Sequence, residues 1–472
     1  MYLKRKIDVF LENWKVKNGR KPLIIRGARQ IGKTEAIRHF AARHYDNIVE
    51  INFVDSPIFK TITMDGYKPE TIIAAISRIN NSFVFKPGRT LVFFDEIQDH
   101  PDIATSLKFF CQDGRYDVIC SGSLLGLHYR QISSNSVGYR EDFEMHALDF
   151  GEFLAAKGYA DAIEGEMLAH LSDSAPFSAA EMAVFPRLFL DYCITGGMPE
   201  VVRRYVESGT FEGVLDIQRQ LNSAYRDDVR KYASGIEQTR IINVLEHIPA
   251  QLAKENKKFI LSKIERGARF MDYWGCVEWL RDAGIVNVCH CLNFPELPLK
   301  GNYDASRYKL YLADSGLLVA QLDDEVQEDL RGRKNLNTYG GGLFENIVAE
   351  AIKKSGGELY YYRREDSRLE EDFFLRSRAN IVPIEVKATT GRSKSLRTLI
   401  DSGHYPDIAF GVKVVDGNLG FANNIYTVPH FCAFLIKDWL SRKEHTAAIS
   451  TSFILGFDRI HRIYRIAKVD SG

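Results

Sequence analysis

Short apolar runs alternate with amphipathic stretches along the first part of the chain. The apolar runs lie at residues 23–25, 48–53, 91–94 and 118–120, and the stretches between them repeat apolar residues at helical spacing. Strand-like and helical patterns in alternation predict an α/β fold in which helices cover a parallel sheet. We assign residues 1–150 to this first domain.

The pattern becomes helical after residue 150. It continues to about residue 232 and is interrupted by loop-like residues at 172–178 and 195–200. This organisation predicts a helical connector or lid over residues 151–232.

Two further units follow the helical segment. Tyr273, Val277 and Leu280 share one helical face ahead of a glycine and a strand-like run, which predicts a winged helix-turn-helix unit over residues 233–335. The segments LFENIVAEAIKK, ELYYYR, DFFLRS and VPIEVKA then predict a helix and three strands, hence a small α/β domain over residues 336–435.

Composition restricts the class of protein. The chain has 472 residues, enough for two to four domains of roughly 150 residues each. Apolar residues make up 45% and charged residues 26%, values typical of a globular chain. The 62 basic and 62 acidic residues give a net charge of zero, which excludes a wholly basic coat for DNA but permits a local basic face.

Cysteine usage and hydropathy indicate the compartment. The seven cysteines form no CxxC pair; Cys289 and Cys291 flank His290 on a strand-like run, where buried small side chains are favoured over a metal site. No apolar run approaches the roughly 20 residues that span a bilayer, and the N-terminus lacks a signal core. We therefore expect a cytoplasmic, reduced protein without membrane contact.

One stretch carries a complete phosphate-binding motif. The string GARQIGKT fits G-x-x-x-x-G-K-S/T and stands between the strand-like PLIIR and the helical EAIRHFAARH. Glycines let backbone N–H groups wrap phosphates, and the N-terminus of the following helix attracts anions. Lys33 is expected to contact the β- and γ-phosphates, and Thr34 to bind Mg²⁺. The predicted nucleotide-binding residues are Gly27, Ala28, Arg29, Gln30, Ile31, Gly32, Lys33 and Thr34.

Candidate catalytic residues follow on two later strands. The run LVFFDE ends in two acids, and parallel strands direct their carboxyl ends toward the ligand crevice. We expect Asp95 to hold Mg²⁺ and Glu96 to polarise the attacking water. In the next strand end, CSGS, Ser123 is the first candidate for sensing the γ-phosphate and Ser121 the second, with a helix cap as the alternative. Arg140 is a candidate charge-neutralising arginine, in cis or from a neighbouring subunit, but a solvated surface arginine is favoured.

The strings GARQIGKT, LVFFDEIQ, CSGSLLG and LDFGEFL resemble the bacterial and archaeal AAA-type ATPases that carry a C-terminal domain of unknown function. The resemblance continues in ITGGMPEVV, LYLADSGLL, GGLFENIVAE and PIEVKA, and it covers roughly residues 15–435. It implies a P-loop ATPase fold with ATP and Mg²⁺ as cofactors. The tail at 436–472 stays unassigned.

A second candidate site lies in the last domain. Glu345 belongs to a helix, Asp372 opens a strand, and alternation places Glu385 and Lys387 on one face of another strand. Carboxylates hold hard metal ions and lysine positions or activates water, as Mg²⁺-dependent phosphodiester hydrolysis requires. The set resembles the PD-(D/E)xK nuclease core, a restriction-endonuclease-like fold with Asp372 and Glu385 as metal ligands. Cleavage, nucleic-acid binding alone and a structural role stay open.

Basic residues gather ahead of the helix that contains Tyr273. They are Lys254, Lys257, Lys258, Lys263, Arg266 and Arg269. Such a cluster suits phosphate contacts, and a wedge between protein parts is an equal alternative. The tyrosines at 360–362 could stack on bases, but an ordinary strand is favoured.

These features predict Mg²⁺-dependent ATP hydrolysis coupled to a C-terminal module that binds DNA or RNA. Two alternatives stay open: a slow nucleotide-dependent switch or scaffold for a protein partner, and an ATP-regulated nuclease. A homo-oligomer is compatible with each of them.

Overall fold

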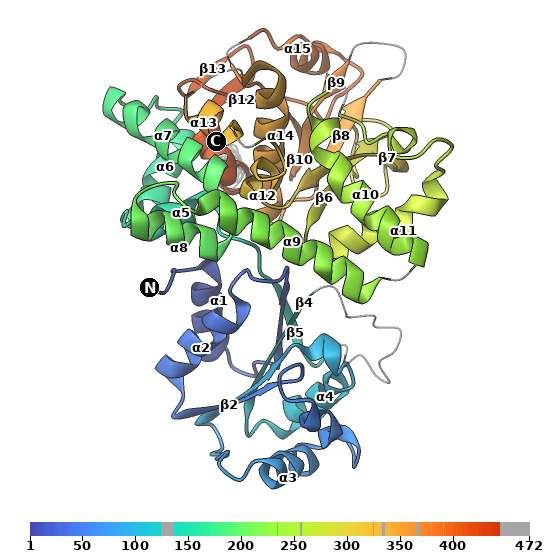
Figure 1. Cartoon of the computed structure of the whole chain (residues 1–472). Coiled ribbons are helices and arrows are strands. Elements are labelled where there is room, and N and C mark those ends of the chain that lie inside the picture. Colours follow the sequence, from blue (N-terminus) through green and yellow to red (C-terminus); the bar gives the residue numbers. More distant parts are fainter. Residues whose placement is uncertain are drawn as a thin grey trace, which may run out of the picture.

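The computed structural model describes residues 1–123, 136, 138–233, 235–254, 257–323, 325–332, 336–364, 369–378, 380–389 and 391–443, without the side chains of 123 and 336–339. The chain is a mixed α/β protein, with a parallel sheet in its N-terminal domain and two further sheets in its C-terminal half (Figure 1). The predicted tail from residue 444 onward lies outside the described residues.

The N-terminal domain is a five-stranded parallel sheet of order β2-β3-β4-β1-β5. Its strands are β1 (Leu23–Gly27), β2 (Asn47–Asn52), β3 (Thr90–Asp95), β4 (Asp117–Ser123) and β5 (Glu141–Glu144). Its helices are α1 (Lys6–Val16), α2 (Lys33–His44), α3 (Pro69–Ile79) and α4 (Ile103–Asp113), with short 3₁₀ segments η1 (Pro57–Thr63) and η2 (Ile97–Asp99).

Both faces of this sheet are buried. Leu23 and Phe93 pack in one apolar core with residues of α1 and α2, whereas Ile24 and Phe94 pack in another with residues of α3 and α4. Neighbouring residues of a strand point to opposite faces, so apolar runs rather than alternating ones are needed in a sheet covered twice. The predicted helix-covered parallel sheet is confirmed.

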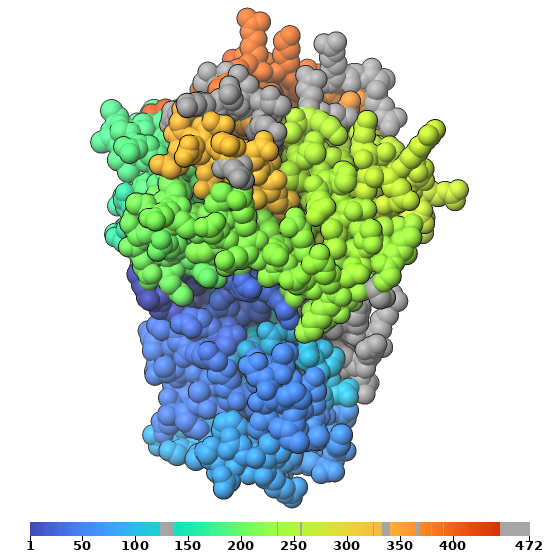
Figure 2. Space-filling model, viewed as in Figure 1, coloured from blue at the N-terminus to red at the C-terminus, as the bar shows by residue number. Residues whose placement is uncertain are grey.

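Five helices follow without a strand. They are α5 (Phe150–Ala156), α6 (Ala162–Asp173), α7 (Ala179–Thr195), α8 (Pro199–Ser208) and α9 (Val214–Tyr232). Asp149 and Ser178 cap α5 and α7 through reciprocal bonds with the glutamates three residues later, which explains where these helices begin. Helix α9 runs along the boundary between the N-terminal domain and the rest of the molecule (Figure 1), and the space-filling view shows the two parts in direct contact there (Figure 2).

The next unit contains two helices and a hairpin. They are α10 (Gly235–Leu252), the 3₁₀ turn η5 (Leu261–Lys263), α11 (Phe270–Asp282), and the antiparallel strands β6 (Val286–Leu292) and β7 (Tyr303–Leu312). Tyr273, Val277 and Leu280 are buried on one side of α11, as their spacing predicts. This order of elements matches the expected helix-turn-helix with a wing, a name that stays a prediction.

The hairpin does not stand alone. Strand β8 (Tyr360–Arg363) pairs with β6 in parallel, and β9 (Glu370–Glu371) follows β8, which gives the sheet order β7-β6-β8-β9. The strand ELYYYR, expected in the last domain, therefore belongs to the hairpin sheet. Pairing with β8 satisfies the backbone groups of β6, which would otherwise form an open edge.

The last domain is a mixed five-stranded sheet of order β10-β11-β12-β14-β13. Its strands are β10 (Phe373–Ser377), β11 (Asn380–Val386), β12 (Gly411–Val415), β13 (Gly420–Ala422) and β14 (Ile425–Pro429). The remaining helices are α12 (Ser315–Val319), α13 (Val326–Arg331), α14 (Leu336–Lys354), α15 (Lys394–Asp401) and the 3₁₀ segment η6 (His430–Leu435). Among the described helices, none is both long enough and apolar enough to cross a membrane.

Candidate functional site

The GARQIGKT motif forms the turn between β1 and α2. Gly27 ends β1, where an added Cβ atom would lie 2.2 Å from the backbone oxygen of Met145. Gly32 caps α2 with a φ of 90°, a left-handed conformation that favours glycine. The first N–H groups of α2 have no partner within the helix, so they supply the donors of an anion site.

Lys33 lies inside this turn. Its Nζ donates to the backbone oxygens of Gly27, at 3.1 Å, and Ala28, at 2.7 Å. Burial lowers the pKa of Lys33 to about 8, although the nearby carboxylates of Glu96 and Asp95 act in the opposite direction. The turn therefore holds an ammonium group at its centre, where phosphate oxygens are expected.

Asp95 joins the turn to the neighbouring strand ends. Thr34 Oγ1 donates to Asp95 Oδ2 at 3.1 Å, and Asn52 Nδ2 donates to the same oxygen at 3.3 Å. Ser121 Oγ donates to Asp95 Oδ1 from β4. The structure thus brings together Thr34 and Asp95, an oxygen pair of the kind that Mg²⁺ prefers, and these residues fit the predicted cofactor.

Glu96 follows β3 with an unusual backbone. Its φ of 55° places a non-glycine residue in the left-handed region, and Gln98 Nε2 donates to its carboxylate. Such a conformation costs about 1–3 kcal/mol and persists where the surroundings impose it. The strain turns the chain directly after Asp95, beside the ammonium of Lys33.

The two serines predicted to sense the γ-phosphate have different surroundings. Ser123 ends β4, and its backbone is the register partner of Gly27; its side chain lies outside the described residues. Ser121, the second candidate, is the serine that contacts Asp95. The side chain of Arg140 is only 8% exposed and forms an ion pair with Asp142 at 3.5 Å. The solvated surface arginine that was favoured is therefore wrong, and a role as an arginine finger stays a prediction.

Arg29 connects the turn to α9, a contact that the sequence analysis missed. Its Nη1 donates to Asp228 Oδ1 at 2.6 Å, and its Nη2 donates to the hydroxyl of Tyr232 at 3.0 Å. Tyr225 in turn donates its hydroxyl proton to the backbone oxygen of Arg29 at 3.0 Å. The three α9 residues are spaced by three and four positions and share a helical face, which is the signal that could have found them.

Arg5 supports the turn from the opposite side, and it too was missed. Its side chain is 6% exposed and donates to the backbone oxygens of Ile31, at 2.8 Å, and His146, at 2.6 Å. Glu152 of α5 accepts a third bond, at 3.1 Å. The P-loop is therefore fixed both to the N-terminal segment and to α5.

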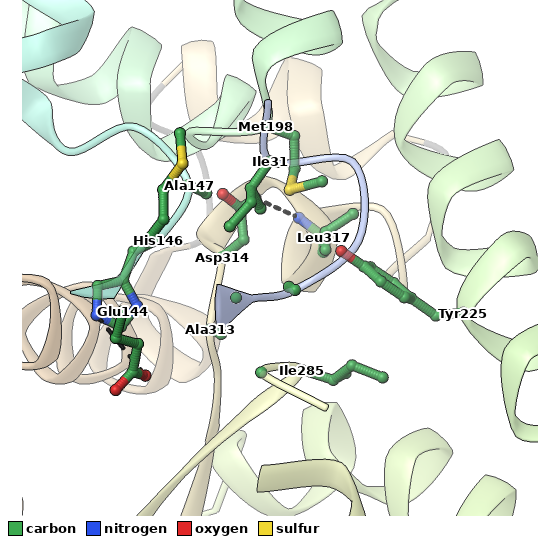
Figure 3. A pocket seen from close by; sticks show the side chains of 14 residues that line it. Ile31, Glu144, His146, Ala147, Met198, Tyr225, Ile285, Ala313, Asp314 and Leu317 are labelled. Carbon is green, nitrogen blue, oxygen red and sulfur yellow. Dashed lines mark hydrogen bonds and ion pairs between the residues drawn. The ribbon is translucent and has the colours of Figure 1, made fainter. Parts of the chain in front are cut away.

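A pocket borders the outer side of the turn (Figure 3). Ile31 faces it from the P-loop, together with Tyr225 of α9 and Leu317 of α12. At the same surface a Cβ atom added to Gly284, whose φ is 72°, would lie 3.2 Å from Ala28. The P-loop thus contacts α9 and the residues preceding β6 directly.

The four nuclease-like residues also converge. Lys387 Nζ lies 2.8 Å from Glu385 Oε1, so the two share a face as alternation predicts. Asp372 Oδ2 accepts a bond from the backbone N–H of Val386 at 2.9 Å. Glu345 of α14 is linked to Asp372 through Lys309, which contacts both carboxylates. No set of three or more metal-ligating side chains is found in the described part of the chain.

Lys309 of β7 lies at the centre of this cluster, and sequence reasoning missed it. Its Nζ is 3.0 Å from Glu345 Oε1, 3.1 Å from Glu370 Oε1 and 3.8 Å from Asp372 Oδ1. Tyr311 and Lys257 also donate to Glu345. Among the described residues, Lys257, Lys309 and Tyr311 therefore all bind Glu345. The available signal was a lysine inside the apolar strand end YKLYL.

Charge and burial set the pKa values of these acids. Burial alone would raise the pKa of Glu345, but Lys309 and Lys257 lower it to about 2. Burial and the charge of Glu345 raise the pKa of Asp372 to about 7. Burial and the charge of Glu385 raise the pKa of Glu371 well above its usual range. Glu345 is therefore the fixed anion of the cluster.

The basic cluster before α11 divides in two. Lys257 points inward to Glu345, so its expected contact with nucleic-acid phosphates is wrong, because a buried carboxylate binds it instead. Lys258 is half-buried, and the other four, Lys254, Lys263, Arg266 and Arg269, are exposed. The tyrosines at 360–362 are buried in β8, in agreement with the ordinary strand that was favoured.

Three family models match successive parts of the chain. Residues 19–154 match the family model described as an AAA domain, residues 186–328 match a domain of unknown function (DUF8612), and residues 340–431 match another (DUF4143). The predicted resemblance is confirmed: the N-terminal domain is of the AAA-type P-loop ATPase class, followed by domains of unknown function.

Solved structures are similar at low identity. The Aeropyrum pernix ORC1 protein in complex with DNA matches at 11% identity and a TM-score of 0.27, over 70% of this chain and 91% of that one. The S. cerevisiae Hsp104–ADP complex matches at 13% and 0.28, over 75% and 44%. A Thermotoga maritima RuvB variant matches at 17% and 0.25, over 60% and 87%. At these values the similarities carry no argument about function, and no curated protein matches the chain.

Proposed function

We propose that this chain is a Mg²⁺-dependent ATPase whose nucleotide state is transmitted from the P-loop to the C-terminal half by α9. The observation that carries the proposal is the ion pair of Arg29 with Asp228, 2.6 Å long. Arg29 belongs to the turn expected to hold the phosphates, so a bound phosphate competes with Asp228 for the same guanidinium group. Release of Asp228 changes how α9 is held.

The residues of the site have distinct roles. Lys33 exchanges its two carbonyl partners for phosphate oxygens and stabilises the charge that develops during transfer. Thr34 and Asp95 would hold Mg²⁺, which neutralises phosphate charge when bound. Ser121 orients Asp95. Glu96 positions the attacking water and accepts its proton.

The test is ATP hydrolysis by wild type, Lys33→Ala and Glu96→Gln. We expect Lys33→Ala to lose nucleotide binding, and Glu96→Gln to bind ATP with little change but to hydrolyse it at least about 100-fold more slowly, the usual range for a general base. Equal thermal unfolding of the three proteins controls for folding. Wild-type turnover in Glu96→Gln would refute its role as the base.

For the partner, we propose nucleic acid bound on the exposed basic face before α11. Lys254, Lys263, Arg266 and Arg269 support this choice because exposed cations bind phosphates without a desolvation cost in the protein core. ATP turnover is measured with double-stranded DNA, single-stranded DNA and RNA at several salt concentrations. We expect one of them to stimulate turnover, with binding that weakens as salt rises and is lost in Arg266→Glu. Absent or salt-insensitive binding would favour a protein partner.

A further inference from the structure

The acidic cluster of the C-terminal domain contains a cation supplied by the chain itself. Glu345 of α14, Glu370 of β9 and Asp372, the residue before β10, all point at the ammonium group of Lys309. The Lys309 side chain is 1% exposed, as is that of Glu345. Asp372, one of the two predicted metal ligands, therefore faces an ammonium group of the chain itself, and the other, Glu385, pairs with Lys387.

The formal charges of the side chains that contact Lys309 are balanced. Lys257 forms a second ion pair with Glu345, and Arg363 Nη1 lies 3.3 Å from Glu370 Oε2. The three carboxylates around Lys309 are thereby matched by three cations, Lys309 included. Of the neighbouring acids, Glu385 pairs with Lys387, and burial together with the charge of Glu385 raises the pKa of Glu371 well above its usual range, which favours its neutral form. A divalent ion at the same point would add two positive charges beside a buried ammonium group, and like charges repel strongly where water is excluded.

We propose that Lys309 takes the place of a metal ion in this nuclease-like site, so that the site binds no Mg²⁺ and acts as a structural joint. Lys309 belongs to β7 of the hairpin unit, whereas Glu345 and Asp372 belong to the domain that follows. The ion cluster therefore fastens the hairpin to α14 and to the start of β10. The residues of the nuclease pattern are present, but their role is structural: they hold two parts of the chain together.

The first experiment counts Mn²⁺ ions bound by wild type and Asp372→Asn without nucleotide, from the electron paramagnetic resonance signal of free Mn²⁺. Both proteins share the P-loop site, so it cancels from the comparison. We expect equal binding, because Asp372 is no metal ligand. A Mn²⁺ site present in wild type and lost in Asp372→Asn overturns the proposal, and Glu385→Gln serves as a second comparison if Asp372→Asn does not fold.

A second experiment removes the ammonium group. We expect Lys309→Ala to unfold at a lower temperature than wild type, and Mn²⁺ to raise its midpoint by several degrees more than that of wild type, since the carboxylates are then open to a metal. Lys300→Ala, which removes an exposed lysine, is the matched control and should behave as wild type. Equal Mn²⁺ effects on wild type and Lys309→Ala overturn the proposal, as does Mg²⁺-dependent cleavage of plasmid DNA by wild type that Asp372→Asn lacks.

Discussion

The ion pair between Arg29 and Asp228 allows a quantitative prediction about nucleotide affinity. Arg29 is 26% exposed and Asp228 9% exposed. A hydrogen bond to a charged group contributes about 1.5–3 kcal/mol, and partial exposure reduces this to about 1–2 kcal/mol. If bound phosphate must take Arg29 from Asp228, this free energy opposes binding. Asp228→Asn should therefore tighten ATP binding by about 5- to 30-fold.

The assay is a titration with a fluorescent ATP analogue in the Glu96→Gln background, where hydrolysis does not interfere. Asp227→Asn is the matched control, because Asp227 is the neighbouring acid, is exposed, and pairs with Arg230 on the surface. It should leave affinity unchanged. An Asp228→Asn protein that folds normally but binds ATP no more tightly would refute competition between phosphate and α9 for Arg29.

Three other predictions concern single positions. Because burial lowers the pKa of Lys33 to about 8 and phosphates raise it again, ATP binding at about pH 8.5 should take up a proton; calorimetry in buffers of different ionisation heat should detect this uptake, and should find none in Lys33→Arg. The folded-state pKa of Glu345, about 2, lies below its usual 4.5, so the ionised side chain contributes about 3 kcal/mol of stability above pH 4.5 that is lost as pH falls toward 2. The difference in unfolding free energy between wild type and Glu345→Gln should therefore shrink between pH 4.5 and 2. A constant difference would contradict the ion-pair account. Gly284→Ala should lower the unfolding free energy by about 1–2 kcal/mol and weaken ATP binding, because its new Cβ meets Ala28; Gly301→Ala, with a positive φ but open space, should reproduce the strain without the loss of affinity.

The N-terminal sheet could be predicted because its information is local. Each strand is a short apolar run, each helix has its own period, and GARQIGKT specifies a turn between one strand and one helix. Asp95 could be placed for the same reason, since the end of a parallel strand faces the crevice whatever its neighbours are. The contact between Thr34 and Asp95 then follows from topology alone.

The supporting cations could not be predicted, because their partners are distant in the chain. Arg29 binds Asp228, 199 residues away, and Arg5 binds Glu152, 147 residues away. The helical spacing of Tyr225, Asp228 and Tyr232 shows that they share a face of α9, but not that Arg29 is their partner. The contact of Arg5 leaves no periodic pattern. The strand β8 was assigned to the wrong sheet for a related reason: an apolar strand shows that it is buried, but not which edge it pairs with.

Burial distinguishes the two ion pairs that join the parts of this molecule. In both, a basic residue of one part meets carboxylates of another, but Arg29 is 26% exposed while Lys309 is 1% exposed. Water and phosphate can replace Asp228 around Arg29, so that pair can exchange partners during a nucleotide cycle. Opening the Lys309 cluster would leave several charges buried without partners, which is far more costly. The contact at the P-loop is therefore suited to transmit a change, and the contact at the nuclease-like site to keep the C-terminal half rigid while it does so.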